Sequence, residues 1–242
     1  MTEPADGEAT RALREAAAQR QLAEARRADA EARKADAEAE RFSQEARRFA
    51  ADADMRELDR AKAQRTEQDE LAGNRFHHVY AFTEQVSKNT AEACIKQLTT
   101  WMRQDTGCPI EIIFNSPGGS VVDGLALYDF IGQVRAAGHV VTTTSIGMAA
   151  SMAGILLQAG DRRIMGREAW LLIHEASFGA GGKMGDVEDT VEWVKKIQKR
   201  IVAIFAARSH MTAAQIERRW KRKDWWLSSD DAFKAGFVDE IR

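Results

Sequence analysis

Hydrophobic and polar positions divide the chain into two parts of different character. Up to Ala72 the sequence mixes alanine with charged residues, and it contains neither glycine nor proline between Gly7 and Gly73. Such a composition favours one long, charged helix. From Gly73 onward, short apolar runs alternate with segments of helical period, which is typical of a globular α/β domain. We therefore predict an extension over residues 1–72 and a folded domain over residues 73–242.

A weak heptad pattern runs through the N-terminal extension. Apolar residues recur there at alternating steps of three and four, as the a and d positions of a coiled coil do. These seam positions are Ala25, Ala28, Ala32, Ala35, Ala39, Phe42, Ala46, Phe49 and Ala53. Because alanine buries little surface, such a seam would be weak, and helices joined by it would pack closely. A solitary charged helix and a weak coiled coil are both compatible with this pattern.

In the folded domain, apolar runs predict strands and amphipathic segments predict helices. Strands are expected at residues 79–82, 110–114, 140–146, 162–165 and 170–173. Helices are expected at residues 89–103, 121–137, 149–158 and 186–208. Thr212 with Gln215 is a capping-box start for a further short helix. The alternation of strands and helices predicts crossover connections and a mostly parallel sheet.

The candidate chemistry begins with Ser151, which lies where an apolar strand turns into an apolar helix. A hydroxyl at such a turn can be exposed while amides at the start of the helix face a developing oxyanion. A serine nucleophile needs a base, and His174 closes the apolar run 170–173. A carboxylate is then needed to orient the imidazole, and Asp224 is the candidate.

Other residues compete for these roles. Ser120 and Ser177 are alternative hydroxyls, although neither is expected to begin an apolar helix. His174 could instead be a structural histidine at the end of a strand. The alternative acids are Glu175, Asp230 and Asp231. Glu175 would point to the opposite face of an extended strand, and the other two resemble first-turn acids of a capped helix.

Four motifs in this order resemble those of the Clp protease proteolytic subunit, the ClpP-type serine peptidases, over residues 110–241. The motifs are Asn115 to Val121 with Ala126 to Asp129, Ile146 to Met152, Ile173-His174, and Leu227-Ser228 with Ala235 to Asp239. The resemblance implies that Ser151, His174 and Asp224 form a catalytic triad. It also implies that the backbone N–H groups of Gly119 and Met152 form the oxyanion hole.

The same resemblance implies a fold, an activity and a set of partners. The fold would be a ClpP/crotonase-like α/β superhelix of stacked β-β-α units, and the activity that of a serine endopeptidase acting through an acyl-enzyme, without metal or organic cofactor. The family forms rings, in which the glycine-rich stretch 179–185 and the helix after it make a handle between rings. Its substrates are polypeptides and its usual partner is an AAA+ unfoldase.

Alternative functions remain open at this point. A phage-type head-maturation or processing protease would need no ATPase and would meet a capsid or scaffold protein instead. Alternatives from other classes are a crotonase-fold acyl-CoA hydratase or thioesterase and an inactive oligomeric scaffold. The chain also departs from the family pattern, because the docking hairpin for the ATPase is not recognisable. Glu175 stands where proline is frequent, and Arg222-Lys223-Asp224 replaces an acid–basic–acid run.

Composition indicates which other classes of protein the chain does not resemble. With 242 residues, of which 44% are hydrophobic and 30% charged, the chain can bury one sizeable core. A formal net charge of −2 gives no argument for binding nucleic acid. Cys94 and Cys108 follow neither a disulfide nor a metal-site pattern, so both are expected to be reduced thiols. No signal peptide and no membrane span is predicted, and a cytoplasmic protein is expected.

Overall fold

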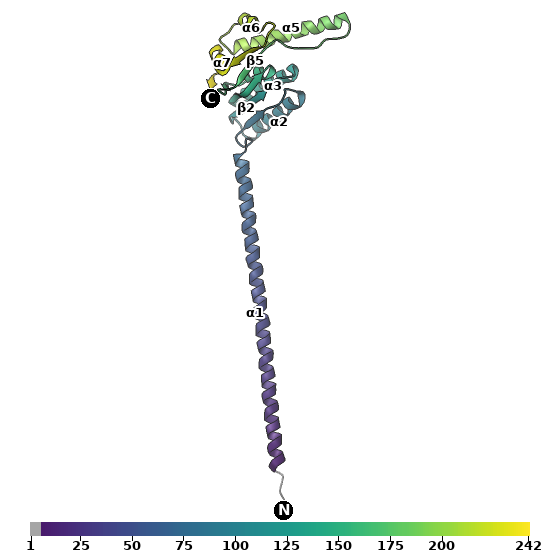
Figure 1. Ribbon diagram of the computed structural model, residues 1–242, viewed down its shortest axis with the longest axis vertical. Coiled ribbons are helices and arrows are strands. Elements are labelled where there is room, and N and C mark those ends of the chain that lie inside the picture. Colours follow the sequence, from purple (N-terminus) through teal and green to yellow (C-terminus); the bar gives the residue numbers. More distant parts are fainter. Residues whose placement is uncertain (1–5) are drawn as a thin grey trace, which may run out of the picture. The chain divides into compact units, whose positions relative to one another are not determined.

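The computed structural model describes residues 6–242 (Figure 1). By its internal contacts the chain separates into two units, one reaching to Gln68 and the other spanning Asp69–Arg242. Residues 1–5 of the predicted N-terminal extension lie outside the described residues.

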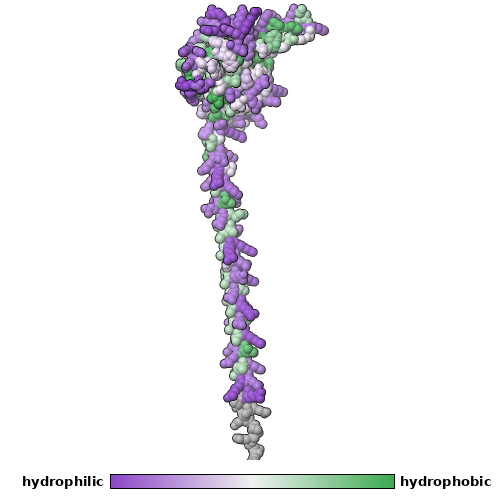
Figure 2. All heavy atoms as spheres, in the orientation of Figure 1, coloured by the Kyte–Doolittle hydropathy of each residue, from purple (hydrophilic) through white to green (hydrophobic). Residues whose placement is uncertain are grey.

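The described part of the first unit belongs to helix α1 (Asp6–Ala72), whose last residues fall in the second unit. This helix is 67 residues long and confirms the long helix predicted from composition. Every residue from Leu13 to Arg60 is exposed, including the aromatic seam residues Phe42 and Phe49. Figure 2 shows hydrophilic residues along its length, interrupted by small patches of apolar ones. The described part of this helix therefore has no core of its own, and helix propensity and backbone hydrogen bonds hold it.

The second unit is built on a mostly parallel sheet, as predicted. Its strands are β1 (Val79–Phe82), β2 (Ile110–Ser116), β3 (Val141–Ala150), β4 (Arg162–Met165), β5 (Trp170–Ile173), β6 (Trp225–Ser228) and β7 (Glu240–Ile241). The order β1-β2-β3-β4-β7 is parallel throughout. Strand β5 pairs in parallel with the end of β3, and β6 pairs antiparallel with β5. Strands β6 and β7 were not predicted from the sequence.

Helices connect and cover these strands. They are α2 (Lys88–Gln104), α3 (Val121–Ala136), α4 (Met152–Leu157), α5 (Met184–Ala207), α6 (Ala213–Trp220) and α7 (Ser229–Ala235). The predicted capping box of Thr212 and Gln215 starts α6. Helix α5 begins two residues before its predicted start, and Figure 1 shows it projecting beyond the other elements of this unit.

The core lies between the sheet and the helices that pack on it. Alternate residues of β2 are buried, so one face of the strand supplies Ile110, Ile112 and Phe114. Helices α2 and α3 contribute Leu98 and Leu127, which are fully buried. Burying a side chain of this size stabilises the fold by about 1.5–3 kcal/mol. This core supports the strands whose ends lie next to the candidate catalytic residues.

Strand β3 corrects the sequence prediction at its end. We expected the strand to end at residue 146 and a helix to begin at residue 149, but Ala149 and Ala150 belong to β3. They pair with Leu171 and Leu172 of β5. Alanine favours a helix locally, but pairing with a neighbouring strand outweighs that weak preference. The helix consequently starts at Met152, directly after Ser151.

An ion pair ties β4 to the C-terminal segment. The guanidinium of the buried Arg163 donates from Nε to Asp239 Oδ2 at 3.0 Å, and its backbone N–H donates to the same oxygen at 2.8 Å. Arg163 Nη1 also donates to Gln158 Oε1 at 2.9 Å. Burial acts to raise the pKa of Asp239, but the bonds and charge of Arg163 outweigh it and lower that pKa below its ordinary value.

Candidate active site

Ser151 occupies a strained turn between β3 and α4. Its backbone has φ 55° and ψ −120°, in a region that residues other than glycine seldom adopt. The N–H of Ser151 donates to the carbonyl of Leu172 at 2.9 Å, and its carbonyl accepts from Ile155 N at 3.3 Å. This strand–serine–helix turn resembles the nucleophile elbow of other serine hydrolases, in which strain exposes the hydroxyl.

The loop Gly118-Gly119 lies directly against this turn. Gly118 has φ 86°, and a Cβ built on it would lie 2.7 Å from Ser151 Cβ and 2.8 Å from Met152 N. Only glycine allows this approach. The backbone after β2 is thereby brought beside the backbone that carries Ser151.

The amides of Gly119 and Met152 are the two donors predicted for an oxyanion hole. The Val86 N–H donates to the Gly118 carbonyl at 2.8 Å, and the Ser120 N–H donates to the Val86 carbonyl at 2.8 Å. In such a parallel bridge the N–H of the residue between, Gly119, faces away from Val86. Met152 is the first residue of α4, where an amide has no partner within the helix. Among the hydrogen bonds of residues 6–242, neither amide is a donor.

His174 and Asp224 each lie one residue beyond the ladder of β5 and β6. The last pair of this antiparallel ladder is Ile173 with Trp225. If the register continued for one more residue, His174 would lie opposite Asp224, and residues directly opposite each other share one face of a sheet. Ser151 is close to the same place, because its amide is bonded to Leu172, two residues before His174. The fold thus brings together three segments that are distant in sequence.

The three side chains are not joined by hydrogen bonds within the described part of the chain. His174 and Ser151 are half-buried, and Asp224 is exposed. Catalytic hydrogen bonds in enzymes without substrate are often long or misaligned. The three candidate residues therefore lie at or next to neighbouring strand ends.

Glu175 lies beyond the end of β5 and bonds to the segment before Asp224. Its Oε2 accepts the backbone N–H of Arg222 at 3.0 Å. Arg222 has φ 56°, so it is another non-glycine residue with a positive φ. The carboxylate of Glu175 therefore holds the turn that leads into Asp224, two residues further on.

Two of the other competing residues, Asp231 and Ser120, cap helices in this fold. Asp231 accepts a hydrogen bond from the Ser228 hydroxyl at 2.9 Å, and its N–H donates to the same hydroxyl at 3.2 Å, which caps α7. Ser120 caps α3 by accepting from Asp123 N at 3.4 Å. Our expectation that Ser120 begins no apolar helix was wrong, since α3 follows it directly. Ser177 is exposed on the loop after β5.

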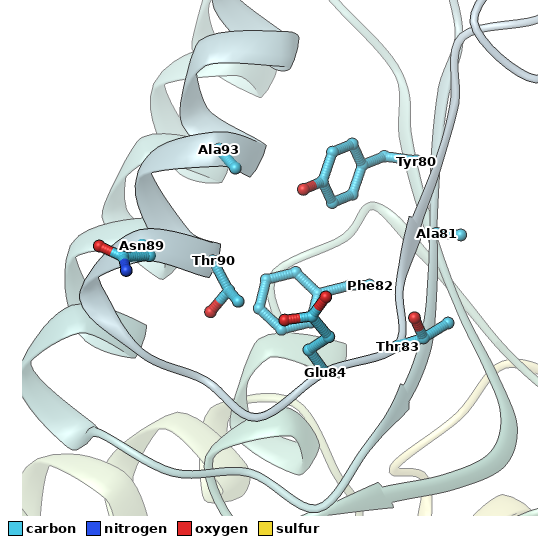
Figure 3. A pocket seen from close by; sticks show the side chains of 8 residues that line it. All are labelled: Tyr80, Ala81, Phe82, Thr83, Glu84, Asn89, Thr90 and Ala93. Carbon is cyan, nitrogen blue, oxygen red and sulfur yellow. The ribbon is translucent and has the colours of Figure 1, made fainter.

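Two cavities lie near these elements. One of about 230 Å³ borders Gly119, and its lining includes Val122, Phe178, Trp193, Val194 and Ile197. The other, of about 250 Å³, lies between β1 and α2, where Tyr80 and Phe82 point toward the helix (Figure 3). Burial raises the pKa of Tyr80 to about 12, so its phenol stays protonated. Only the first cavity adjoins a residue of the candidate site.

Strand β6, which directly follows Asp224, was not predicted from the sequence. The run Trp225-Trp226-Leu227-Ser228 forms β6, and its two aromatic residues were a readable signal for a strand. The run is only four residues long, and its partner β5 lies more than fifty residues earlier in the chain. Its pairing therefore could not be read from local pattern.

Comparison with known proteins adds an independent line of observation. A sequence model of the Clp protease family, described as "Clp protease", matches residues 67–242. The ATP-dependent Clp protease proteolytic subunit of Bacteroides thetaiotaomicron is 35% identical over 161 residues, which are 65% of this chain and 70% of that protein. A protein of the same name from Bacteroides fragilis is 34% identical over 161 residues, which are 65% of this chain and 75% of that protein. Among residues 6–242, no helix is long and apolar enough to cross a lipid bilayer.

Proposed function

The chain belongs to the Clp protease family and is a ClpP-type serine peptidase with the α/β fold predicted for it, and we propose that it cleaves peptide bonds with Ser151, His174 and Asp224. The observation that carries this proposal is the strained turn at Ser151, packed against Gly118. A backbone conformation of this kind costs on the order of 1–3 kcal/mol, and such residues cluster at active sites.

Each candidate residue then has one task. His174 takes the proton of Ser151 Oγ as that oxygen attacks the carbonyl carbon of the scissile bond, and Asp224 orients the imidazole. The electron pair of the carbonyl moves onto its oxygen, which accepts hydrogen bonds from the N–H groups of Gly119 and Met152. His174 next gives its proton to the leaving amine, and an acyl-enzyme remains. Water attacks the acyl group, His174 accepts its proton, and the acid product leaves as Ser151 regains a proton.

Substrates are proposed to be polypeptides with an apolar side chain near the cleaved bond. The cavity of about 230 Å³ beside Gly119 is lined mostly by aliphatic and aromatic residues, together with Ser120 and Ser177. Its walls come from the loop after β2, the start of α3, the loop after β5 and helix α5. Burial of an apolar side chain there would supply binding energy of about 25 cal/mol for each Å² removed from water.

Assembly into a closed homo-oligomeric ring is proposed to involve α5. The N-terminal half of this helix and the loop before it expose Phe178, Met184 and Trp193. Light scattering should show a discrete oligomer, and charge at two of these positions, as in Met184→Glu with Trp193→Glu, should dissociate it. A single-site control is Glu188→Lys, which changes charge at an exposed polar position of the same helix.

The two parts of the chain are proposed to have different tasks. Residues 73–242 would form the peptidase domain, and residues 1–72 would be an extension that contacts a partner or a protein substrate. Because the Bacteroides relatives are named ATP-dependent proteolytic subunits, the partner proposed first is an AAA+ unfoldase. A phage-type processing role predicts instead that a protein substrate is cut without any ATPase.

A fluorophosphonate probe tests the nucleophile. The probe should label Ser151 alone, and Ser151→Ala should abolish both labelling and cleavage of a fluorogenic peptide. Removing a triad member typically lowers kcat by about 10⁴-fold or more. Ser177→Ala is the matched control, because its hydroxyl is exposed and lies on the neighbouring loop.

Three outcomes would contradict the proposal. Labelling at Ser177 or Ser120 would identify that serine as the nucleophile in place of Ser151. Cleavage by Ser151→Ala at the rate of the unaltered chain would exclude Ser151 as the nucleophile. A correctly assembled chain that neither reacts with the probe nor cleaves any of a panel of peptides would favour a scaffold or an acyl-CoA enzyme.

A further inference from the structure

A second group of chemically active side chains lies at the opposite edge of the sheet. His78 directly precedes β1, Cys108 lies two residues before β2, and His139 lies two residues before β3. These three strands are adjacent and parallel, so their amino ends meet at one edge. Asp105, which caps the end of α2, comes to the same place. The candidate active site is at the other edge, because Ser151 follows the carboxyl end of β3.

The distances within this group are about 1 Å longer, at most, than those of an occupied metal site. One potential ligand atom from each of His78, Asp105 and Cys108 lies within 4.8 Å of the other two. His78 Nε2 is 3.8 Å from Asp105 Oδ2. In a tetrahedral zinc site, bonds of about 2.1 Å to nitrogen and about 2.3 Å to sulfur separate neighbouring ligand atoms by roughly 3.5 Å. Side-chain movements of about 1 Å would close the group around one ion.

The surrounding structure holds these side chains in position. His78 has φ 55°, and the ring of Trp101 packs edge-to-face against its imidazole with the centroids 5.5 Å apart. The Cys108 N–H donates to the Asp105 carbonyl at 3.2 Å, so one tight turn presents both the thiol and the carboxylate. His139 is buried behind the thiol, with Nδ1 3.5 Å from Cys108 Sγ and 3.1 Å from the Cys108 carbonyl oxygen.

The donor set indicates which ion would bind. A thiolate and an imidazole favour a borderline-soft ion such as zinc over magnesium or calcium, which prefer oxygen ligands. A cavity of about 650 Å³, lined in part by Arg75, His78 and Asp105, gives access from solvent. We propose that His78, Asp105 and Cys108 bind one zinc-class ion, with His139 hydrogen-bonded behind Cys108.

Such an ion would be structural. It would join the start of β1 to the turn between α2 and β2, and it lies at the other end of the sheet from Ser151. Its loss should therefore lower thermal stability and leave the hydrolytic residues in place. This inference is independent of the proposed function, since metal binding and fluorophosphonate labelling are measured separately.

Cobalt titration of the full chain, first treated with a chelator, tests the site. We expect one Co²⁺ per chain with a thiolate-to-cobalt absorption band, displacement by Zn²⁺, and a higher midpoint of thermal unfolding with either ion. Cys108→Ser should lose the band, whereas Cys94→Ser should keep it. His78→Ala should weaken binding by at least about tenfold, and His77→Ala, at an exposed neighbouring position, should not. His139→Ala should weaken binding about 10- to 100-fold.

Clear results would overturn the site. A chain that gives no thiolate band, or one whose band survives in Cys108→Ser, does not use this thiol. Equal metal affinity of His78→Ala and His77→Ala would show that His78 is not a ligand. The group would then be a His78–Asp105 pair and a separate Cys108–His139 contact, without a metal site. Should Cys108→Ser fail to fold, the two histidine variants still decide, because His78 is only partly buried and His77 is exposed.

Discussion

Among single residues, Gly118 is the position where the turn at Ser151 leaves no space for a side chain. A Cβ there would lie 2.5 Å from the Ala150 carbonyl oxygen and 2.7 Å from Ser151 Cβ. Gly118→Ala must therefore push the loop and the serine turn apart. We expect kcat/KM for a fluorogenic peptide to fall roughly 100-fold, the usual effect of a misplacement near 1 Å.

Gly138→Ala is a control that distinguishes the steric clash at Gly118 from the strain of placing alanine at a positive φ. Gly138 has φ 97°, comparable with the 86° of Gly118, but nothing lies within 4 Å of a Cβ built on it. This variant should lose some thermal stability and retain activity. Equal activity of Gly118→Ala and Gly138→Ala would mean that the approach of Gly118 to Ser151 has no catalytic consequence.

Glu175 is expected to act as a positioning residue for the turn that leads to Asp224. Glu175→Ala removes the acceptor of the Arg222 N–H. We expect kcat to fall about tenfold with KM unchanged, because the acid would be misaligned while substrate contacts remain. Glu175→Gln should restore most of the activity, since an amide oxygen also accepts this bond. If Glu175 were the triad acid itself, glutamine would be as harmful as alanine.

Among the elements, the tie between β4 and the segment before β7 should control stability in acid. The pKa of Asp239 is below its ordinary value in the folded chain. The ionised carboxylate therefore adds to the free energy of unfolding above about pH 4, which is the usual pKa of an aspartate in an unfolded chain. This stabilisation is lost as the pH falls through the pKa of the folded chain. Asp239→Asn should cost on the order of 1–2 kcal/mol near neutral pH, discounted because the carboxylate is partly exposed.

Thermal unfolding followed from pH 7 to pH 3 checks this expectation. The difference in melting temperature between the unaltered chain and Asp239→Asn should shrink as the pH falls. Asp189→Asn is the control, because Asp189 is exposed on α5. A difference that is independent of pH would show that the carboxylate of Asp239 does not stabilise the fold by its charge.

For the whole molecule, α1 should be dispensable for chemistry. None of the candidate catalytic residues lies on it, and a chain that begins at Gly73 should cleave a short peptide at a rate close to that of the full chain. Degradation of a folded protein substrate should depend on α1 if it contacts a partner. Loss of short-peptide cleavage in the shortened chain would place α1 in the active assembly.

The alanine seam of α1 can be tested within the full chain. Ala32→Asp with Ala39→Asp places charges on the seam, whereas Ala30→Asp with Ala37→Asp places the same charges on the opposite side of the helix. In a coiled coil the first pair should reduce oligomer size or helix content, because a buried unpaired charge is costly. Equal behaviour of both variants would indicate a solitary, solvated helix.

The sequence alone determined the elements that depend on local pattern. The bounds of β1, β4 and β5 were predicted to the residue, because each is an apolar run between polar or turn-forming residues. The capping box at Thr212 was also readable locally. For the candidate site, the sequence supplied the residues and the family resemblance their expected roles, while the triad itself stays a prediction.

Only the tertiary structure decided what depends on pairing between distant segments. Ala149 and Ala150 become strand because β5 lies beside them, and this pairing leaves Ser151 alone in the turn. The antiparallel ladder with β6 ends one residue away from both Asp224 and His174. Likewise, His78 and Cys108 meet because parallel strands align their starts at one edge. Local propensities amount to fractions of a kcal/mol for each residue, and the packing of the whole sheet outweighs them.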